Sequence, residues 1–167
     1  LGLRVGMIDT ERTAVYAAEQ AAFDGTDLES VQPFEVVVAA IDAVTSGAWW
    51  PGPGVRVTST RRDSRSSSAR LVDDSVTEIR LSREQMTVAT AAHELAHALA
   101  GPAAGHRALY RAAYLDVVAV MTNIDSVDRR HHIHVEQLAE AFRDAGLSVG
   151  ERRWPPPPES TGSAIAL

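Results

Sequence analysis

HELAH, residues 93–97, is the most informative stretch of this sequence. Two of the six histidines stand four residues apart here, and a glutamate directly follows the first. On an α-helix, residues four apart project from nearly the same face, about 6 Å apart along the axis. The imidazoles of His93 and His97 can therefore converge on one metal ion, and we predict both as ligands.

Glu94 has the position expected of a general base beside such a pair. It points to the side of the two histidines, where it can reach a metal-activated water without binding the metal. There it can remove a proton from the water and later pass it to a leaving amine. The pattern is the HExxH arrangement, and Glu94 is the predicted catalytic carboxylate.

A catalytic zinc site uses three protein ligands and keeps one position open for water, so a third ligand is required. His106, nine residues after His97, is the first candidate. The glycines and the proline of residues 98–105 can end one helix and turn the chain back toward the pair. Asp116 and Glu136, on the helices that follow, are alternative carboxylate ligands.

Hydrophobic periodicity and turn residues predict an α+β fold, with a small β-sheet packed on helices and HELAH on the central helix. Asp9 is expected to cap the first helix, and Ser82 with Gln85 to form a capping box at the start of the central helix. The serine-rich residues 61–74 are expected to form a hairpin connection or a mobile loop. The expected elements are helices over 9–23 and 33–46, strands over 55–60 and 76–81, and helices over 82–100, 106–122 and 134–145.

Length and composition set the domain organisation. The 167 residues, 45% of them hydrophobic, suffice for one core of ordinary size. We expect an N-terminal extension over residues 1–8, a single domain over 9–150, and a proline-rich disordered tail over 151–167.

Composition also excludes several kinds of chemistry. The absence of cysteine rules out disulfides and thiolate ligands, so a metal must be held by histidine and carboxylate. The net charge of −6 argues against a surface that binds nucleic acid throughout, although a local basic patch stays open. No apolar run is long enough for a membrane span, and the first residues lack the pattern of a secretory signal, so a cytoplasmic location is expected.

Three segments carry a resemblance to known families. HELAH followed by GH at residues 105–106 resembles the compact zincins of the SprT-like and WLM-like type. DTERTAVYAAE (9–19) and HRALYRAAYLDVV (106–118) are similar to a family of actinobacterial metallohydrolases defined by HExxH. The resemblance covers roughly residues 9–147 and implies a compact zincin-like fold. It also implies Zn²⁺ held by His93, His97 and His106, with Glu94 as the catalytic carboxylate.

The predicted function is that of a zinc-dependent metallopeptidase that cleaves a peptide or protein substrate. Such a reaction needs a donor that stabilises the tetrahedral oxyanion. Tyr110, one helical turn beyond His106, is the first candidate for that donor, with Tyr114 and Arg107 as alternatives. The strand over residues 78–81 is expected to pair with an extended peptide.

A non-catalytic zincin-fold binding or regulatory module, including one that associates with DNA, is the alternative function. The four arginines of residues 61–70 are the segment that would contact phosphates, although an exposed surface loop is the favoured interpretation. His131, His132 and His134 invite an auxiliary metal site, but consecutive histidines diverge in direction. A solvated turn before the last helix is therefore the preferred interpretation.

Overall fold

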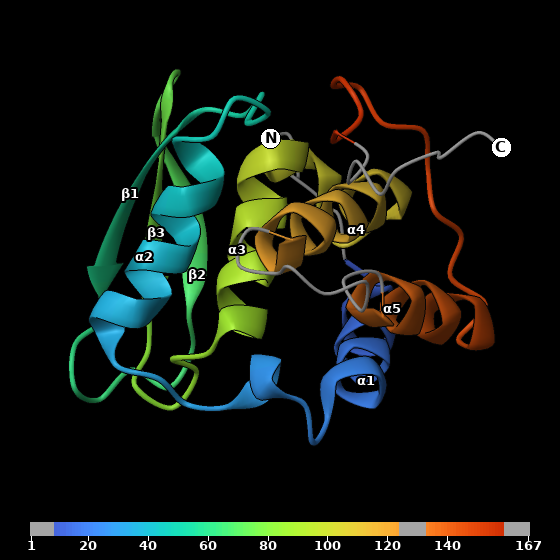
Figure 1. Ribbon diagram of the computed structural model, residues 1–167, viewed down its shortest axis with the longest axis horizontal. Helices are drawn as coiled ribbons and strands as arrows, with labels where there is room; N and C mark the ends of the chain where they lie inside the picture. Colours follow the sequence, from blue (N-terminus) through green and yellow to red (C-terminus); the bar gives the residue numbers. More distant parts are fainter. Residues whose placement is uncertain (1–8, 124–132, 159–167) are drawn as a thin grey trace, which may run out of the picture.

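The computed structural model describes residues 9–123 and 133–158. It is an α+β structure, as the sequence predicts (Figure 1). The elements in chain order are α1 (Arg12–Phe23), η1 (Asp27–Glu29), α2 (Phe34–Thr45), β1 (Gly54–Ser59), β2 (Ser68–Asp73), β3 (Val76–Leu81), α3 (Val88–Ala100), η2 (Pro102–Ala104), α4 (Ala108–Asn123) and α5 (Ile133–Asp144).

The helix α3 occupies the centre of the arrangement. Figure 1 shows it between the sheet with α2 on one side and α4 with α5 on the other. Its sequence, VATAAHELAHALA, is rich in small residues, which let neighbouring elements approach closely. Leu95 of α3, Ile41 of α2 and Val117 of α4 are fully buried in one continuous core. The HELAH segment is thus held rigidly by packing on several sides.

The sheet has the strand order β1-β3-β2. β1 runs parallel to β3, with Val57 opposite Ile79, and β2 runs antiparallel to β3, with Ala69 opposite Ile79. β3 is therefore paired on both sides, and it buries Ile79 and Leu81 completely. The expectation that residues 78–81 offer a free edge to a peptide is corrected, because the free edges belong to β1 and β2.

β2 falls within residues 61–74, which were expected to connect two strands as a hairpin or to form a loop. It is a strand whose residues are mostly exposed, and the adjacent apolar residues Leu71 and Val72 interrupt the alternation of apolar and polar residues that indicates a strand. Hydrogen bonds to β3, rather than burial, hold it in place. The parallel pairing of β1 with β3 also excludes a hairpin between them.

Two helices begin three or more residues later than predicted. α1 begins at Arg12 and not at Asp9. α3 begins at Val88, where the side chain of Thr87 accepts a hydrogen bond from the backbone N–H of Thr90. Ser82 and Gln85, expected to form the capping box, bond instead to the segment before β2. The Ser67 N–H donates to the Gln85 side chain, and the Ser67 hydroxyl accepts from the Ser82 N–H.

The described residues after 150 lie against the domain, which corrects the prediction of a disordered tail for residues 151–158. The Arg152 guanidinium donates to both carboxylate oxygens of Asp116, at 2.8 and 2.9 Å. The Trp154 indole donates to the same carboxylate at 2.8 Å. The Trp49 indole donates to the carbonyl oxygen of Pro155 at 3.0 Å. Residues 1–8 and 159–167 lie outside the described part of the chain.

Replacing Asp116 by Ala is expected to destabilise the fold. The change leaves the Trp154 indole and the Arg152 guanidinium without their acceptor, although the arginine side chain is 44% exposed and water can partly replace the lost bonds. We expect the free energy of unfolding to fall by about 1–3 kcal/mol, measured by urea denaturation. Arg153→Ala, which removes a neighbouring exposed arginine, is the control and should change it by less than about 0.5 kcal/mol.

No helix within the described residues combines the length and the apolar character needed to cross a bilayer.

Candidate metal centre

The positions of the three histidines follow from the local chain geometry. α3 presents His93 and His97 on one face, as four-residue spacing requires. The helix ends at Gly101, whose φ is 86°, and the chain turns through η2 to Gly105, whose φ is 53°. Both values lie in the left-handed region that favours glycine. These two glycines return the chain so that His106, just before α4, faces the first pair.

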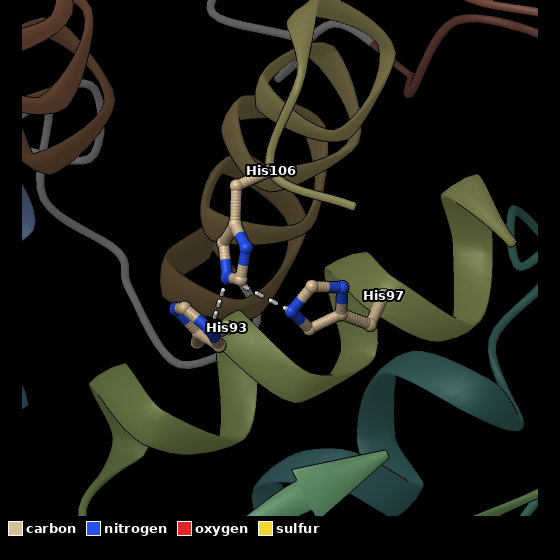
Figure 2. Close-up of side chains that lie close together, drawn as sticks. All are labelled: His93, His97 and His106. Atoms are coloured by element: carbon tan, nitrogen blue, oxygen red, sulfur yellow. Dashed lines mark hydrogen bonds between the residues drawn. The ribbon is translucent and has the colours of Figure 1, made fainter. Parts of the chain in front are cut away.

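The three imidazoles meet at their Nε2 atoms (Figure 2). The Nε2 atom of His106 lies 3.2 Å from Nε2 of His97 and 3.3 Å from Nε2 of His93. His93 and His106 are buried, and His97 is half-buried. The predicted convergence of these three residues is confirmed, and they form a group that can hold a metal ion.

Two carboxylates lie behind this cluster. Nδ1 of His93 is 3.1 Å from an oxygen of Glu19, and Nδ1 of His106 is 2.5 Å from an oxygen of Asp9. Each carboxylate accepts the Nδ1 proton, which fixes the ring orientation and directs the Nε2 lone pair toward the cluster. Both come from the N-terminal part of the chain, and the sequence prediction missed both roles.

The carboxylate contacts of the two histidines favour a proton arrangement that fits a cation. In a neutral ring that donates its Nδ1 proton to a carboxylate, as the contacts of His93 and His106 favour, Nε2 is an acceptor, and two such atoms cannot donate to each other. Acceptor nitrogens that face one another at 3.3 Å repel, and this repulsion is offset when a cation accepts both lone pairs. The donor set is entirely imidazole, which suits a transition-metal ion such as zinc, copper or nickel.

The acid–base properties of His97 and His106 agree with this arrangement, whereas the pKa of His93 is shifted in the opposite direction. Burial, followed by the charges of His93 and His106, lowers the pKa of His97 to about 3, so this ring is neutral at physiological pH. Burial also lowers the pKa of His106. Burial opposes protonation of His93 as well, but the hydrogen bond and the charge of Glu19 outweigh it and raise the pKa. Neutral imidazole is the form that binds metals.

Glu94 lies beside the cluster on α3. Its side chain is buried, and burial raises the pKa of the carboxyl to about 7, although the charge of His93 opposes the shift. A carboxylate with a pKa near neutrality is well matched to accept and return a proton. Glu94 and His93 both line a cleft of about 510 Å³, so that a molecule in the cleft can reach them.

Two further residues of α1 stand at the rim of this cleft and were not predicted. The Tyr16 ring stacks on the His93 ring, with the centroids 5.1 Å apart and an angle of 16° between the planes. Burial raises the pKa of the Tyr16 hydroxyl, so it keeps its proton at neutral pH. The guanidinium of Arg12 lies 5.5 Å from the centre of the Tyr16 ring. Both residues belong to the DTERTAVYAAE segment, but nothing in their spacing indicated the contact with residue 93.

Tyr110, the predicted oxyanion donor, is engaged elsewhere. Its hydroxyl donates to the backbone carbonyl oxygen of His93 at 3.2 Å, and the residue is fully buried. Its ring lies 4.3 Å from that of His97, between centroids. Tyr110 therefore joins α4 to α3, the helix that carries two of the clustered histidines, and does not line the cleft.

The alternative donors are also occupied by protein groups. The hydroxyl of Tyr114 donates to Glu19, and the guanidinium of Arg107 donates to the backbone carbonyl oxygens of residues 103 and 104. The alternative ligands lie apart from the cluster: Asp116 is bound by Arg152 and Trp154, and Glu136 is exposed on α5.

The remaining predicted segments lie outside this site. His131 and His132 fall outside the described residues, whereas His134 is on α5, 6.3 Å from the ring of Phe23. The four arginines of residues 61–70 are exposed, and the last of them is part of β2.

No protein-family model, curated protein sequence or solved structure matches this chain. Its class is therefore defined by the fold and the site alone. It is a small α+β protein in which a central helix and the following turn bring three histidines together around a position that can hold a metal ion.

Proposed function

We propose that this protein is a zinc-dependent peptidase, a compact zincin in which His93, His97 and His106 hold the zinc and Glu94 acts as the general base. The observation that carries the proposal is the convergence of three Nε2 acceptors beside a buried carboxylate that opens onto a cleft. The resemblance of HELAH and its flanking segments to actinobacterial metallohydrolases and to SprT-like and WLM-like zincins agrees with this function.

The separation of the ligand atoms supports zinc as the metal. For a tetrahedral ion with Zn–N bonds of 2.0–2.1 Å, the ligand nitrogens lie about 3.3 Å apart. The two Nε2 separations in the cluster are 3.2 and 3.3 Å. An octahedral ion with bonds of similar length would need about 2.9 Å between adjacent ligands. Three histidines also leave the fourth tetrahedral position for water or substrate.

When bound, zinc supplies a Lewis acid that acidifies water and polarises a carbonyl oxygen. The side chains of the protein supply the proton transfer. Glu94 accepts the proton of the attacking water and returns it to the nitrogen of the leaving amine. The buried position of Glu94 keeps bulk water away from this proton transfer.

The cleft also offers a means of aligning an extended peptide. Residues 66–68, which lead into β2, line the cleft together with His93 and Glu94. β2 is an exposed edge strand, and its outer backbone groups are available to pair with a peptide as an added strand. In the proposal, this pairing sets the orientation of the substrate relative to Glu94.

The proposal is tested by incubating the purified chain with fluorescein-labelled casein. We expect the zinc-loaded protein to release labelled peptides, and a chelator such as 1,10-phenanthroline to stop the release. Readdition of zinc should restore it. Mass spectrometry of the products should show new amino termini, which identifies the reaction as peptide-bond hydrolysis.

A zinc-loaded protein that cleaves neither casein nor a randomised peptide library contradicts the peptidase function. In that case the alternative of a non-catalytic module is measured directly. A module that associates with DNA would bind duplex DNA with an affinity that falls steeply with salt and falls further when Arg61 and Arg62 are replaced.

Replacing the carboxylates behind the ligands is expected to weaken zinc binding. Glu19→Gln and Asp9→Asn keep the shape of the side chain but remove the charge that orients His93 and His106. We expect each change to lower zinc affinity by about 10- to 100-fold, measured by competition with a chromophoric chelator. Asp24→Asn, which alters another carboxylate that lines the cleft, is the control and should leave the affinity unchanged.

A further inference from the structure

The rim of the cleft holds an exposed tyrosine in contact with two of the three clustered histidines. Tyr16 is 40% exposed, stacks on His93 and lies 5.5 Å from the ring of His106, between centroids. Here one part of the side chain contacts the ligands, and another part stays open to a molecule in the cleft.

Arg12 stands one helical turn before Tyr16 and shares its position at the cleft. Its guanidinium lies over the Tyr16 ring, and its positive charge acts on Tyr16, on Glu94 and on the histidines. Among the described residues that line the cleft, Arg12 is the one arginine, and the lining also contains five acidic side chains: Glu19, Asp24, Glu29, Glu84 and Glu94. Arg12 is therefore the fixed positive charge that can stabilise a negative charge developing in this cleft.

Peptide hydrolysis creates such a charge. When the oxygen of water forms a bond to the carbonyl carbon, the π electrons of the carbonyl move to its oxygen, and the proton of the water goes to Glu94. The oxyanion then returns its electrons to the carbon as the C–N bond breaks, and the departing nitrogen takes the proton from Glu94. A donor fixed beside the oxyanion lowers the barrier of both steps.

We propose that the hydroxyl of Tyr16, supported by the guanidinium of Arg12, donates the hydrogen bond that stabilises this oxyanion. This inference rests on the peptidase function proposed above. It replaces Tyr110, Tyr114 and Arg107, whose donors are taken up by protein groups. Tyr16 reaches the cleft from α1, so the N-terminal helix contributes a catalytic residue and not only the carboxylates that orient the ligands.

The first test compares the zinc-loaded full chain with its Tyr16→Phe and Arg12→Met variants on fluorescein-labelled casein. We expect Tyr16→Phe to lower kcat by about 100-fold, the typical effect of removing one oxyanion donor. KM and the zinc content should stay within about threefold of the wild type, because the donor acts only in the transition state. Arg12→Met should lower kcat less, because it removes the support and not the donor.

The second test needs no turnover. A blocked phosphinic tripeptide, in which a tetrahedral phosphinate replaces the scissile amide, is titrated calorimetrically into each zinc-loaded protein. We expect Tyr16→Phe to weaken its binding by about the same factor as it lowers kcat/KM, as a transition-state analogue requires. Gln20→Ala, which removes another α1 side chain at the cleft, is the matched control and should leave both values unchanged.

The outcomes separate this inference from the proposed function. If the wild type and Tyr16→Phe are equally active while Glu94→Gln is inactive, the role of Tyr16 alone is overturned. Loss of zinc from Tyr16→Phe also overturns it, because the tyrosine would then act through its stacked ligand. A wild type no faster than Glu94→Gln overturns the peptidase function itself.

Discussion

Replacing Glu94 by Gln should slow hydrolysis strongly while the protein keeps its zinc. The amide has the size of the carboxyl group but cannot accept the proton of water or return it to the leaving nitrogen. We expect kcat to fall by about 10²–10⁴-fold, the usual contribution of a general base, with a zinc content equal to that of the wild type. Steady-state hydrolysis of labelled casein and metal analysis of the same samples measure the two quantities.

The control for this change is Glu84→Gln, because Glu84 also lines the cleft but lies outside α3. It should retain at least about a third of the wild-type rate, since a surface carboxylate of the cleft makes no proton transfer. Retention of the wild-type rate by Glu94→Gln would show that the buried carboxylate is not the base. A decrease caused by zinc loss would be recognised from the metal analysis.

Replacing His97 by Ala should remove tight zinc binding and the stabilisation that accompanies it. Two ligands remain, and we expect the affinity to fall by more than about 100-fold, which exceeds the effect of losing an orienting carboxylate. Zinc at 1,000 times its Kd stabilises the wild type by about 4 kcal/mol, because it binds the folded state. For a chain of this length, 1 kcal/mol raises Tm by about 2–4 °C, so the zinc-induced increase should be roughly 8–16 °C.

The matched control is His134→Ala, which removes a described histidine outside the cluster. It should keep both the zinc content and the increase in Tm on adding zinc, whereas His97→Ala should lose both. Stoichiometric zinc in the His97→Ala protein, with an unchanged thermal shift, would show that the metal binds elsewhere. Differential scanning calorimetry with and without zinc provides the comparison.

Short-range patterns in the sequence determined most of the helices of this protein and the clustering of its histidines. Helical periodicity predicted α2, α4 and α5 to within a few residues, because a helix buries one face and its apolar residues recur with its own period. The same period brought His93 and His97 to one face of α3. Glycines at 101 and 105, which adopt left-handed conformations, were enough to predict that His106 would return to that pair.

The surroundings of the ligands could not be predicted in this way. Asp9 was expected to cap a helix, yet it contacts His106, 97 residues further along the chain. Glu19 contacts His93, 74 residues away, and Tyr16 stacks on the same ring. No local spacing encodes such pairs, because they depend on how α1 is placed by its packing against α5 and η1.

Tertiary contacts also decided which of the local sequence patterns formed the structure that they predict. Ser82 and Gln85 have the spacing of a capping box, but the Ser82 hydroxyl donates to the Arg65 carbonyl oxygen and the Gln85 side chain accepts from the Ser67 N–H. α3 therefore begins at Val88. β2 is mostly exposed, and it is held in the sheet by hydrogen bonds to β3. The sequence by itself determined the approximate positions of the helices and the clustering of the three histidines, since these depend on neighbours within a few residues. The tertiary structure decided the edge strand, the orienting carboxylates and the rim of the cleft, since hydrogen bonding and packing between distant segments outweigh local preference.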